Sequence, residues 1–251
     1  HDALPIYEYN PRWWSSKKLL MQSLTFLVIL LVGFAAISGL YYIQKKPTDK
    51  AVGFFSYFLL FTFIVEALAS IPKIIYWNEP LHFLKETFLY NNFWLYNPYL
   101  IISFVVYILY FTWNISNRKI RHVVKSSLIF YTIICVINLI FSDVFFKSHS
   151  VVTYILGNFL LLGVIFYYYF EILLSSKILN IKREISFYIS IPALLFFLTT
   201  TPILIYYKYY TSQSPEFIKL SRSVLIGLNI FMYSFYSIAF LSLANKKKSR
   251  S

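Results

Sequence analysis

Long apolar runs alternate with short polar segments along the whole chain. No run shows the two-residue alternation of a barrel strand, and each is close to the ~20 residues that a helix needs to cross a hydrocarbon core. The pattern predicts an all-α polytopic membrane protein, with seven transmembrane helices in one domain that covers residues 1–251. The predicted spans are residues 19–43, 52–72, 97–115, 126–146, 151–174, 185–207 and 223–244.

The polar segments differ in their content of Lys and Arg, and this difference predicts the orientation of the chain. The denser basic segments follow the first, third, fifth and seventh runs. Because cytoplasmic loops are enriched in Lys and Arg, we expect the N-terminus outside and the C-terminus in the cytoplasm. The basic residues of these segments are Lys45, Lys46, Lys50, Arg118, Lys119, Arg121, Lys125, Lys177, Lys182, Arg183, Lys246, Lys247, Lys248 and Arg250.

The composition is that of a membrane protein rather than a soluble one. The chain is 59% hydrophobic, 22% aromatic and 13% charged. Its net charge of +13 does not imply nucleic-acid binding, because most basic residues lie at predicted cytoplasmic helix ends, where anionic lipid headgroups attract them. We therefore expect the lipid bilayer, and no nucleic acid, as a partner.

Two single residues bear on redox state and processing. The only cysteine, Cys135, lies in the middle of a predicted span, which excludes an intrachain disulfide. The sequence begins with His1 rather than Met, and this fits a trimmed tag and a cleaved signal peptide equally well. Neither residue identifies the compartment.

The long segment between the second and third runs differs from the other loops. Asn78 is a suitable N-cap and Pro80 fits the first turn of a helix. We expect residues 79–90 to form a short amphipathic helix on the outer membrane surface, because the apolar stretch is too short to cross the bilayer. The apolar face of this helix consists of Leu81, Leu84 and Phe88.

Polar side chains inside the spans predict a candidate site, because a polar group in hydrocarbon usually faces the bundle interior or a water-filled cavity. Counting from the outer helix ends places most of them at one level, roughly 9–12 Å below the outer boundary, with Asp143 nearer the surface. We expect a ligand pocket open to the outside, although hydrogen bonding between helices explains the same residues. The candidate pocket residues are Glu66, Ser103, Asn138, Asp143, Asn158, Thr200, Asn229 and Tyr233.

Glu66 and two prolines carry the most specific predictions. Bonds between helices seldom need a charge, so Glu66 is expected to be protonated or paired with a base and to act in function. Pro192 and Pro202 lie well inside the sixth span, where they predict kinks that serve as a hinge or are static. The candidate bases for Glu66 are Lys73, Lys208 and Arg222.

Signatures of membrane enzymes and of several seven-helix families are missing from the sequence. There is no His-Glu-x-x-His motif and no Gly-x-Ser-x-Gly motif. Residues 223–244 contain no Lys for a retinal Schiff base. We therefore expect no catalytic residue, no metal site and no cofactor.

Residues 228–240 read Leu-Asn-Ile-Phe-Met-Tyr-Ser-Phe-Tyr-Ser-Ile-Ala-Phe and resemble the closing helix of small seven-helix membrane proteins of unassigned function from Bacteroidota-type bacteria. The Glu66 helix, residues 158–173 and the helix with Pro192 and Pro202 are similar to further segments of these proteins. The N-terminal extension and the 73–97 loop depart from them. Because this family resembles the membrane sensor modules of histidine kinases, the resemblance implies a signalling role by association and a bacterial cytoplasmic membrane.

The sequence thus predicts a non-enzymatic, receptor-like or complex-forming membrane protein. It would sense an unidentified small ligand or a partner on the outer side and signal to a cytoplasmic partner. A small-molecule or proton-coupled transporter that uses Glu66 is the first alternative, and it requires the polar track to continue inward. An intramembrane enzyme of unfamiliar type is the second, and it requires clusters of His, Asp or Glu.

Overall fold

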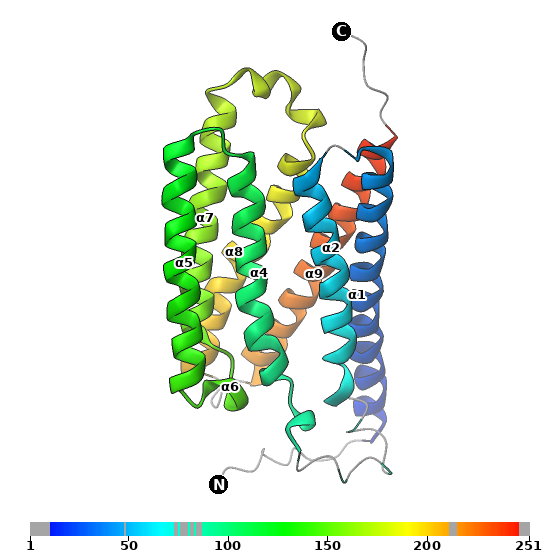
Figure 1. Cartoon of the computed structure of the whole chain (residues 1–251). Coiled ribbons are helices and arrows are strands. Elements are labelled where there is room, and N and C mark those ends of the chain that lie inside the picture. Colours follow the sequence, from blue (N-terminus) through cyan, green and yellow to red (C-terminus); the bar gives the residue numbers. More distant parts are fainter. Residues whose placement is uncertain are drawn as a thin grey trace.

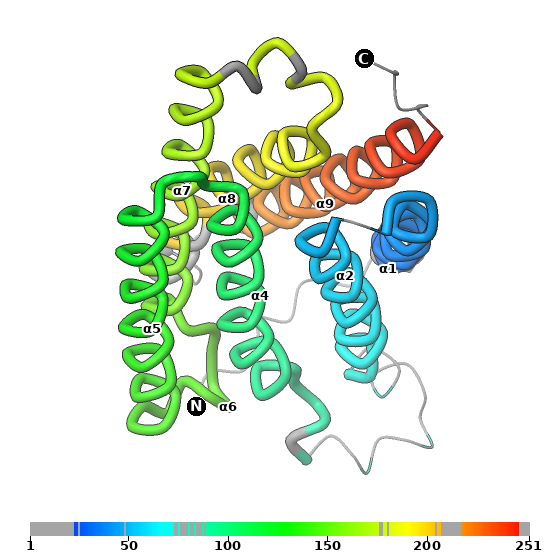
Figure 2. Tube along the Cα trace, turned by 45° about the horizontal axis from the view of Figure 1, so that its top comes forward, coloured from blue at the N-terminus to red at the C-terminus, as the bar shows by residue number. Residues whose placement is uncertain are grey.

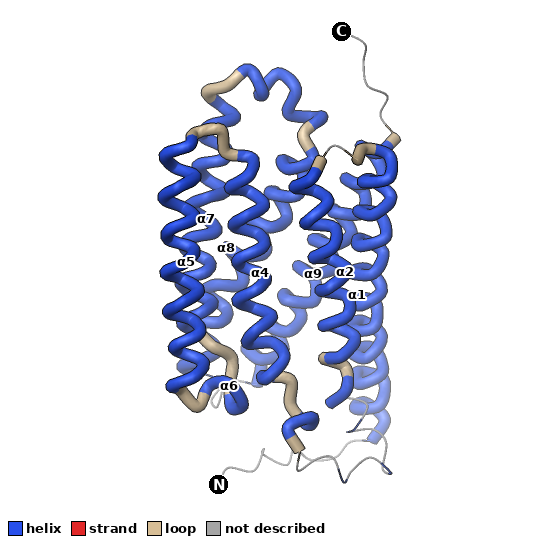
Figure 3. Tube along the Cα trace, viewed as in Figure 1, coloured by secondary structure: helices blue, strands red, loops and turns tan. Residues whose placement is uncertain are grey.

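The computed structural model describes residues 11–47, 49–72, 75, 80, 83, 87–210 and 215–245. All regular structure in these residues is helical (Figure 3), with no strand among them. Seven helices are long and apolar enough to cross a membrane. The prediction of an all-α polytopic membrane protein with seven candidate spans is therefore confirmed.

The seven long helices run up and down through the bundle, each antiparallel to the next (Figure 1). The short elements mark its two ends: α6 lies at one end and η3 at the other, and we call these the α6 end and the η3 end. The long helices are α1 Pro11–Lys45, α2 Lys50–Leu68, α4 Phe93–Asn114, α5 Arg118–Phe141, α7 Val151–Leu173, α8 Ile185–Tyr210 and α9 Pro215–Ala244. The short ones are η2 Phe88–Tyr90, α6 Val144–Lys147 and η3 Ser176–Arg183.

The helices form two groups that lie side by side (Figure 2). The first group consists of α1, α2 and α9, with α1 packed against both partners. The second consists of α4, α5 and α7, which contact one another. The groups meet where α2 contacts α4, while α8 touches both α7 and α9 and so joins them along the other side.

Aromatic side chains fill the space where the two groups meet. The ring of Phe55 on α2 lies 5.2 Å from that of Tyr107 on α4 and 5.6 Å from that of Tyr236 on α9, both edge to face. All three side chains are buried. Lipid is as apolar as these side chains, so close packing and interhelical hydrogen bonds hold such a bundle together.

Within the second group, a glycine permits close packing. A Cβ placed on Gly157 of α7 would lie 2.5 Å from the ring of Phe104 on α4, so no other residue fits there without a shift. Small residues at such positions let helix backbones approach each other.

Polar caps begin two of the long helices, α2 and α5, ahead of their predicted spans. Asp49 accepts a hydrogen bond from the backbone N–H of Val52 at 3.1 Å, and Asn117 accepts one from Lys119 at 3.0 Å. Such caps satisfy backbone donors that a helix start leaves free. They explain why α2 and α5 begin before the apolar runs do.

Several boundaries differ from the sequence prediction, most clearly in the fourth run and in the 73–97 loop. The fourth run, expected to be one helix over 126–146, is divided: α5 ends at Phe141, Ser142 is extended, and α6 follows separately. Most of the expected surface helix over 79–90 lies outside the described residues. Its described final turn, Phe88–Tyr90, is a 3-10 helix, and Phe83 is largely exposed.

Both candidate hinge prolines lie inside α8, which is helical throughout Ile185–Tyr210. Nearby hydroxyls bond to the helix backbone: Thr200 Oγ1 donates to the Phe196 carbonyl at 2.8 Å, and Thr201 Oγ1 to the Phe197 carbonyl at 2.7 Å. Threonines of this kind accommodate proline in membrane helices. A hinge at Pro192 or Pro202 stays a prediction.

Candidate functional site

The structure divides the eight candidate pocket residues among separate places. It brings Glu66, Ser103 and Tyr233 together where α2, α4 and α9 meet. Asn138 and Asp143 lie at the α6 end beside α6, Asn158 and Thr200 lie between α7 and α8, and the Asn229 amide bonds its own helix. Whether these residues line one ligand pocket stays a prediction.

Glu66 on α2 is the most distinctive of these residues because it joins the two helix groups. It is half-buried and accepts a hydrogen bond of 2.9 Å from the hydroxyl of Tyr96 on α4. Tyr99 on α4 and Tyr233 on α9 are near enough to interact with it electrostatically. The described neighbours of the Glu66 carboxyl group therefore include three tyrosines.

The three candidate bases for Glu66 lie on different segments of the chain. Arg222 on α9 is exposed. Lys73 and the side chain of Lys208 lie outside the described residues. The prediction of a basic partner therefore stays open, while the bond to Tyr96 is a contact that sequence reasoning missed.

A second polar contact joins α2 and α4 one turn deeper in the bundle. Tyr99 Oη donates to Thr62 Oγ1 at 3.3 Å and also bonds with Ser103. Thr62 and Ser103 are buried. Ser103 therefore belongs to this site, as expected, through Tyr99 rather than through Glu66 itself.

Further buried polar contacts follow along α4 toward the η3 end. The hydroxyls of Tyr107 and Tyr236 share a hydrogen bond of 3.1 Å, and that of Tyr110 shares one of 2.8 Å with Ser186 on α8. Ser186 also donates to Asn114 Oδ1 at 3.0 Å. We call Tyr96, Tyr99, Tyr107 and Tyr110 the α4 tyrosines.

Asp49 lies at the η3 end of this series. It interacts electrostatically with Tyr110, and burial raises the pKa of its carboxyl group above the usual value. Carboxyl groups thus stand near both ends of the α4 tyrosines, Glu66 toward the α6 end and Asp49 at the η3 end. The sequence did not reveal this because nothing in it distinguishes these tyrosines from the others among the 23 in the chain.

At the α6 end, a buried amide organises the connection between α5 and α7. The Nδ2 of Asn97 lies 3.1, 3.3 and 3.0 Å from the carbonyl oxygens of Val144, Phe145 and Ser148, and its Oδ1 accepts from the N–H of Ser150 at 3.0 Å. Asn97 is fully buried. An amide that satisfies this many backbone groups holds the connection in place.

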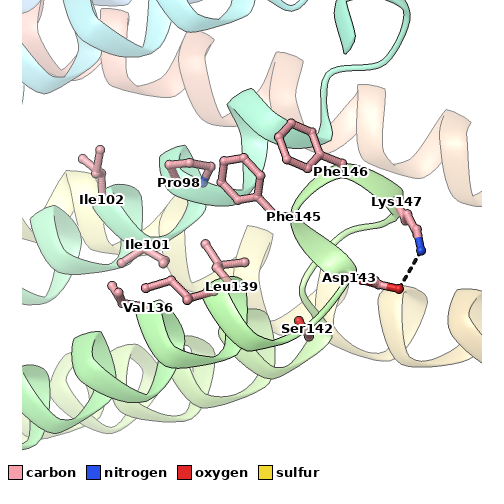
Figure 4. Close-up of a pocket in the computed structure, with 11 residues that line it drawn as sticks. Pro98, Ile101, Ile102, Val136, Leu139, Ser142, Asp143, Phe145, Phe146 and Lys147 are labelled. Atoms are coloured by element: carbon pink, nitrogen blue, oxygen red, sulfur yellow. Dashed lines mark hydrogen bonds and ion pairs between the residues drawn. The ribbon is translucent and has the colours of Figure 1, made fainter. Parts of the chain in front are cut away.

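The candidate pocket residues at the α6 end, Asn138 and Asp143, have different surroundings. Asn138 is half-buried, and its Oδ1 accepts a hydrogen bond of 3.0 Å from the Ser150 hydroxyl. Asp143 is exposed and forms an ion pair with Lys147 at 2.5 Å (Figure 4). Hydrogen bonding by Lys147 lowers the pKa of the Asp143 carboxyl group.

Asn158 and Thr200 join α7 to α8. The Nδ2 of Asn158 donates to the Phe197 carbonyl at 2.9 Å, and the Thr200 hydroxyl bonds to that of Tyr154. Both residues are buried. These contacts are interhelical hydrogen bonds of the kind expected to stabilise a bundle.

An apolar groove of about 630 Å³ opens between α4, α5 and α6 (Figure 4). Its apolar walls come from Ile101 and Ile102 of α4 and from Val136 of α5. Asp143 and Lys147 stand at its edge. Asp143 is therefore a candidate pocket residue that lines this groove. The groove is apolar, and Glu66 is not among its lining residues.

No three His, Cys, Asp or Glu residues of the described chain lie close enough together to hold a metal ion. No family model, no curated protein and no solved structure matches the chain. The fold defines the class: an all-α, multi-pass membrane protein. Its function has to be argued from the Glu66 site.

Proposed function

We propose that this protein is a non-enzymatic, receptor-like membrane protein of a bacterial cytoplasmic membrane. It receives a ligand or partner at the α6 end, which the charge pattern of the loops predicts to lie outside. A shift between the two helix groups then carries the signal to a partner at the η3 end. The observation that carries the proposal is the hydrogen bond between Glu66 of one group and Tyr96 of the other.

A contact between two groups can transmit a signal only if its strength differs between two states. Glu66 meets this condition because protonation, or the binding of a cation, changes how strongly its carboxyl group accepts the hydrogen bond from Tyr96. The contact lies where α2 meets α4, so a change there alters how the groups fit together. The α4 tyrosines continue this contact surface toward the η3 end.

The η3 end supplies a surface for an acidic partner. Its exposed basic residues come from three separate segments of the chain. Such a surface attracts acidic protein segments as well as anionic lipid. Among the described residues, the exposed basic ones at this end are Lys45, Lys50, Arg118, Lys119, Lys125, Lys182 and Arg183.

The proposal is tested by measuring distances between the two groups at the η3 end. Spin labels on Lys50→Cys and Lys119→Cys, both at exposed positions, report the distance between α2 and α5 in lipid nanodiscs. We expect the distance distribution of the parent to change between neutral and acidic pH. The Glu66→Gln variant should show the same distribution at both pH values. Tyr188→Phe, which removes an exposed hydroxyl, is the control and should behave as the parent. Identical distributions at all pH values in the parent would overturn the proposal.

Orientation is tested by labelling from outside the cell. A cysteine at Ser148 on the α6 end should react with an impermeant thiol reagent, and one at Ser116 on the η3 end should not. The native Cys135 is buried and gives the background. The reverse pattern would place the η3 end outside.

A proton-coupled transporter is the second candidate, and the α4 tyrosines favour it. They carry hydroxyl groups at intervals from the Glu66 site toward the η3 end, as the inward polar track of a transporter would. Purified protein in liposomes with an internal pH dye tests this. A proton flux above that of empty liposomes, abolished by Glu66→Gln, would favour the transporter, and no flux would exclude proton transport.

A further inference from the structure

The groove between α4, α5 and α6 lies at the side of the bundle. It is built mainly on α4 and α5, both candidate membrane spans, and its walls include the exposed side chains of Ile102 and Val136. In a bilayer, an apolar groove at this place faces the acyl chains. Water would find few polar partners inside it, and an empty groove would forfeit dispersion contacts, so an acyl chain is the natural occupant.

The edge of the groove carries one charge of each sign. Asp143 and Lys147 form an ion pair whose side chains are 83% and 70% exposed, so both keep donor or acceptor capacity for a further partner. The apolar side chains that line the groove lie to one side of this pair, with Pro98 and Phe146 among them (Figure 4). A lipid chain in the groove would place its headgroup beside this pair.

We propose that the groove holds an acyl chain of a phospholipid with a primary-amine headgroup, from the leaflet at the α6 end. The lipid phosphate accepts hydrogen bonds from Lys147, and the lipid ammonium donates to Asp143. This phosphoethanolamine headgroup complements both charges. A choline headgroup has no N–H to donate, and a glycerol headgroup leaves Asp143 facing a net negative lipid.

The test is native mass spectrometry of the full chain released from nanodiscs made with equal amounts of phosphatidylethanolamine, phosphatidylglycerol and phosphatidylcholine. We expect phosphatidylethanolamine to be retained over the other two by about two- to fivefold, the range of an exposed ion pair. Asp143→Asn should shift the preference to phosphatidylglycerol. Lys147→Gln should lower the retention of both phosphatidylethanolamine and phosphatidylglycerol. Equal retention of all three lipids would overturn the headgroup assignment.

The groove itself is tested separately from its edge. Val136→Trp fills the groove and should lower the amount of retained lipid, whereas Ile137→Trp, at an exposed neighbouring position that does not line the groove, should not. Both variants add the same side chain to α5, so helix content by circular dichroism checks that both are folded. Equal lipid retention by the two variants would show that no chain occupies the groove. Either result leaves the Glu66 proposal untouched.

Discussion

Two polar side chains at the α6 end, Asn97 on α4 and Glu66 on α2, make different kinds of contact. Asn97 is fully buried and bonds to backbone groups of the α5–α7 connection, all on the side of the second helix group. Glu66 is half-buried and bonds to a phenol across the boundary between the groups. A satisfied buried amide fixes one arrangement, whereas a carboxyl held by a hydroxyl can exchange partners.

The difference suggests that the second group is rigid at this end and that the boundary between the groups is adjustable. Contacts inside a group should therefore contribute most to stability. Contacts between the groups should contribute little to stability and much to response.

The largest loss of stability is expected for Asn97→Ala. The change leaves several buried backbone groups without a partner, so the free energy of unfolding should fall by about 3 kcal/mol. Asn229→Ala is the matched control, because the bond that this amide makes among the described residues is to the Leu225 carbonyl of its own helix, at 2.8 Å. Unfolding in mixed detergent micelles measures both, and similar losses for the two variants would contradict the special role of Asn97.

Gly157→Ala should have the next largest effect. The new Cβ would meet the Phe104 ring, and overpacking of this kind lowers stability by about 1–3 kcal/mol. Gly163→Ala in the same helix meets no atom within 4 Å and should not destabilise. If both variants were equally stable in the same unfolding assay, the close contact between α4 and α7 would not be a rigid one.

Glu66→Gln should change stability by less than about 1 kcal/mol, because the amide oxygen can still accept a hydrogen bond from Tyr96. The same variant should abolish the pH-dependent change in distance at the η3 end. A large loss of stability would instead make Glu66 a structural contact like Asn97, and it would remove the contrast between the two residues.

The smallest effects are expected at two carboxyl groups outside the spans. The folded-state pKa of Asp49 is raised, so its ionisation weakens the fold as pH rises through that pKa, and Asp49→Asn should stabilise at neutral pH. The folded-state pKa of Asp143 is lowered, so its contribution is present above the unfolded pKa and is lost as pH falls. Unfolding measured against pH should therefore give slopes of opposite sign for the two sites.

The sequence predicted the seven spans because bilayer thickness and hydropathy dictate helix length. It misplaced the end of the fourth helix because the apolar residues Val144, Phe145 and Phe146 resume after only two polar residues, so the run reads as continuing. Where the helix is interrupted, the amide of Asn97, which is distant in the sequence, bonds to the backbone carbonyls of the following segment. Composition does not record such a contact.

The candidate site was predictable only in part, for a related reason. The depth of a polar residue follows from counting along its helix, which identified Glu66. Whether two residues meet depends on how each helix is rotated about its axis and on which helices pack against it. Asn229, at the same predicted level, bonds its own helix, and Asn158 bonds α8. The partner of Glu66 is one of many tyrosines, so nothing in the sequence singled out Tyr96.

The measurement that tests the central claim most directly is a double-mutant cycle on the contact between the groups. Glu66→Gln, Tyr96→Phe and the double variant are compared by the pH-dependent distance between spin labels at positions 50 and 119. If the Glu66–Tyr96 contact links the groups, each single variant loses the response and the double variant loses no more than either one. A full response in Tyr96→Phe, or independent and additive losses, would contradict the account.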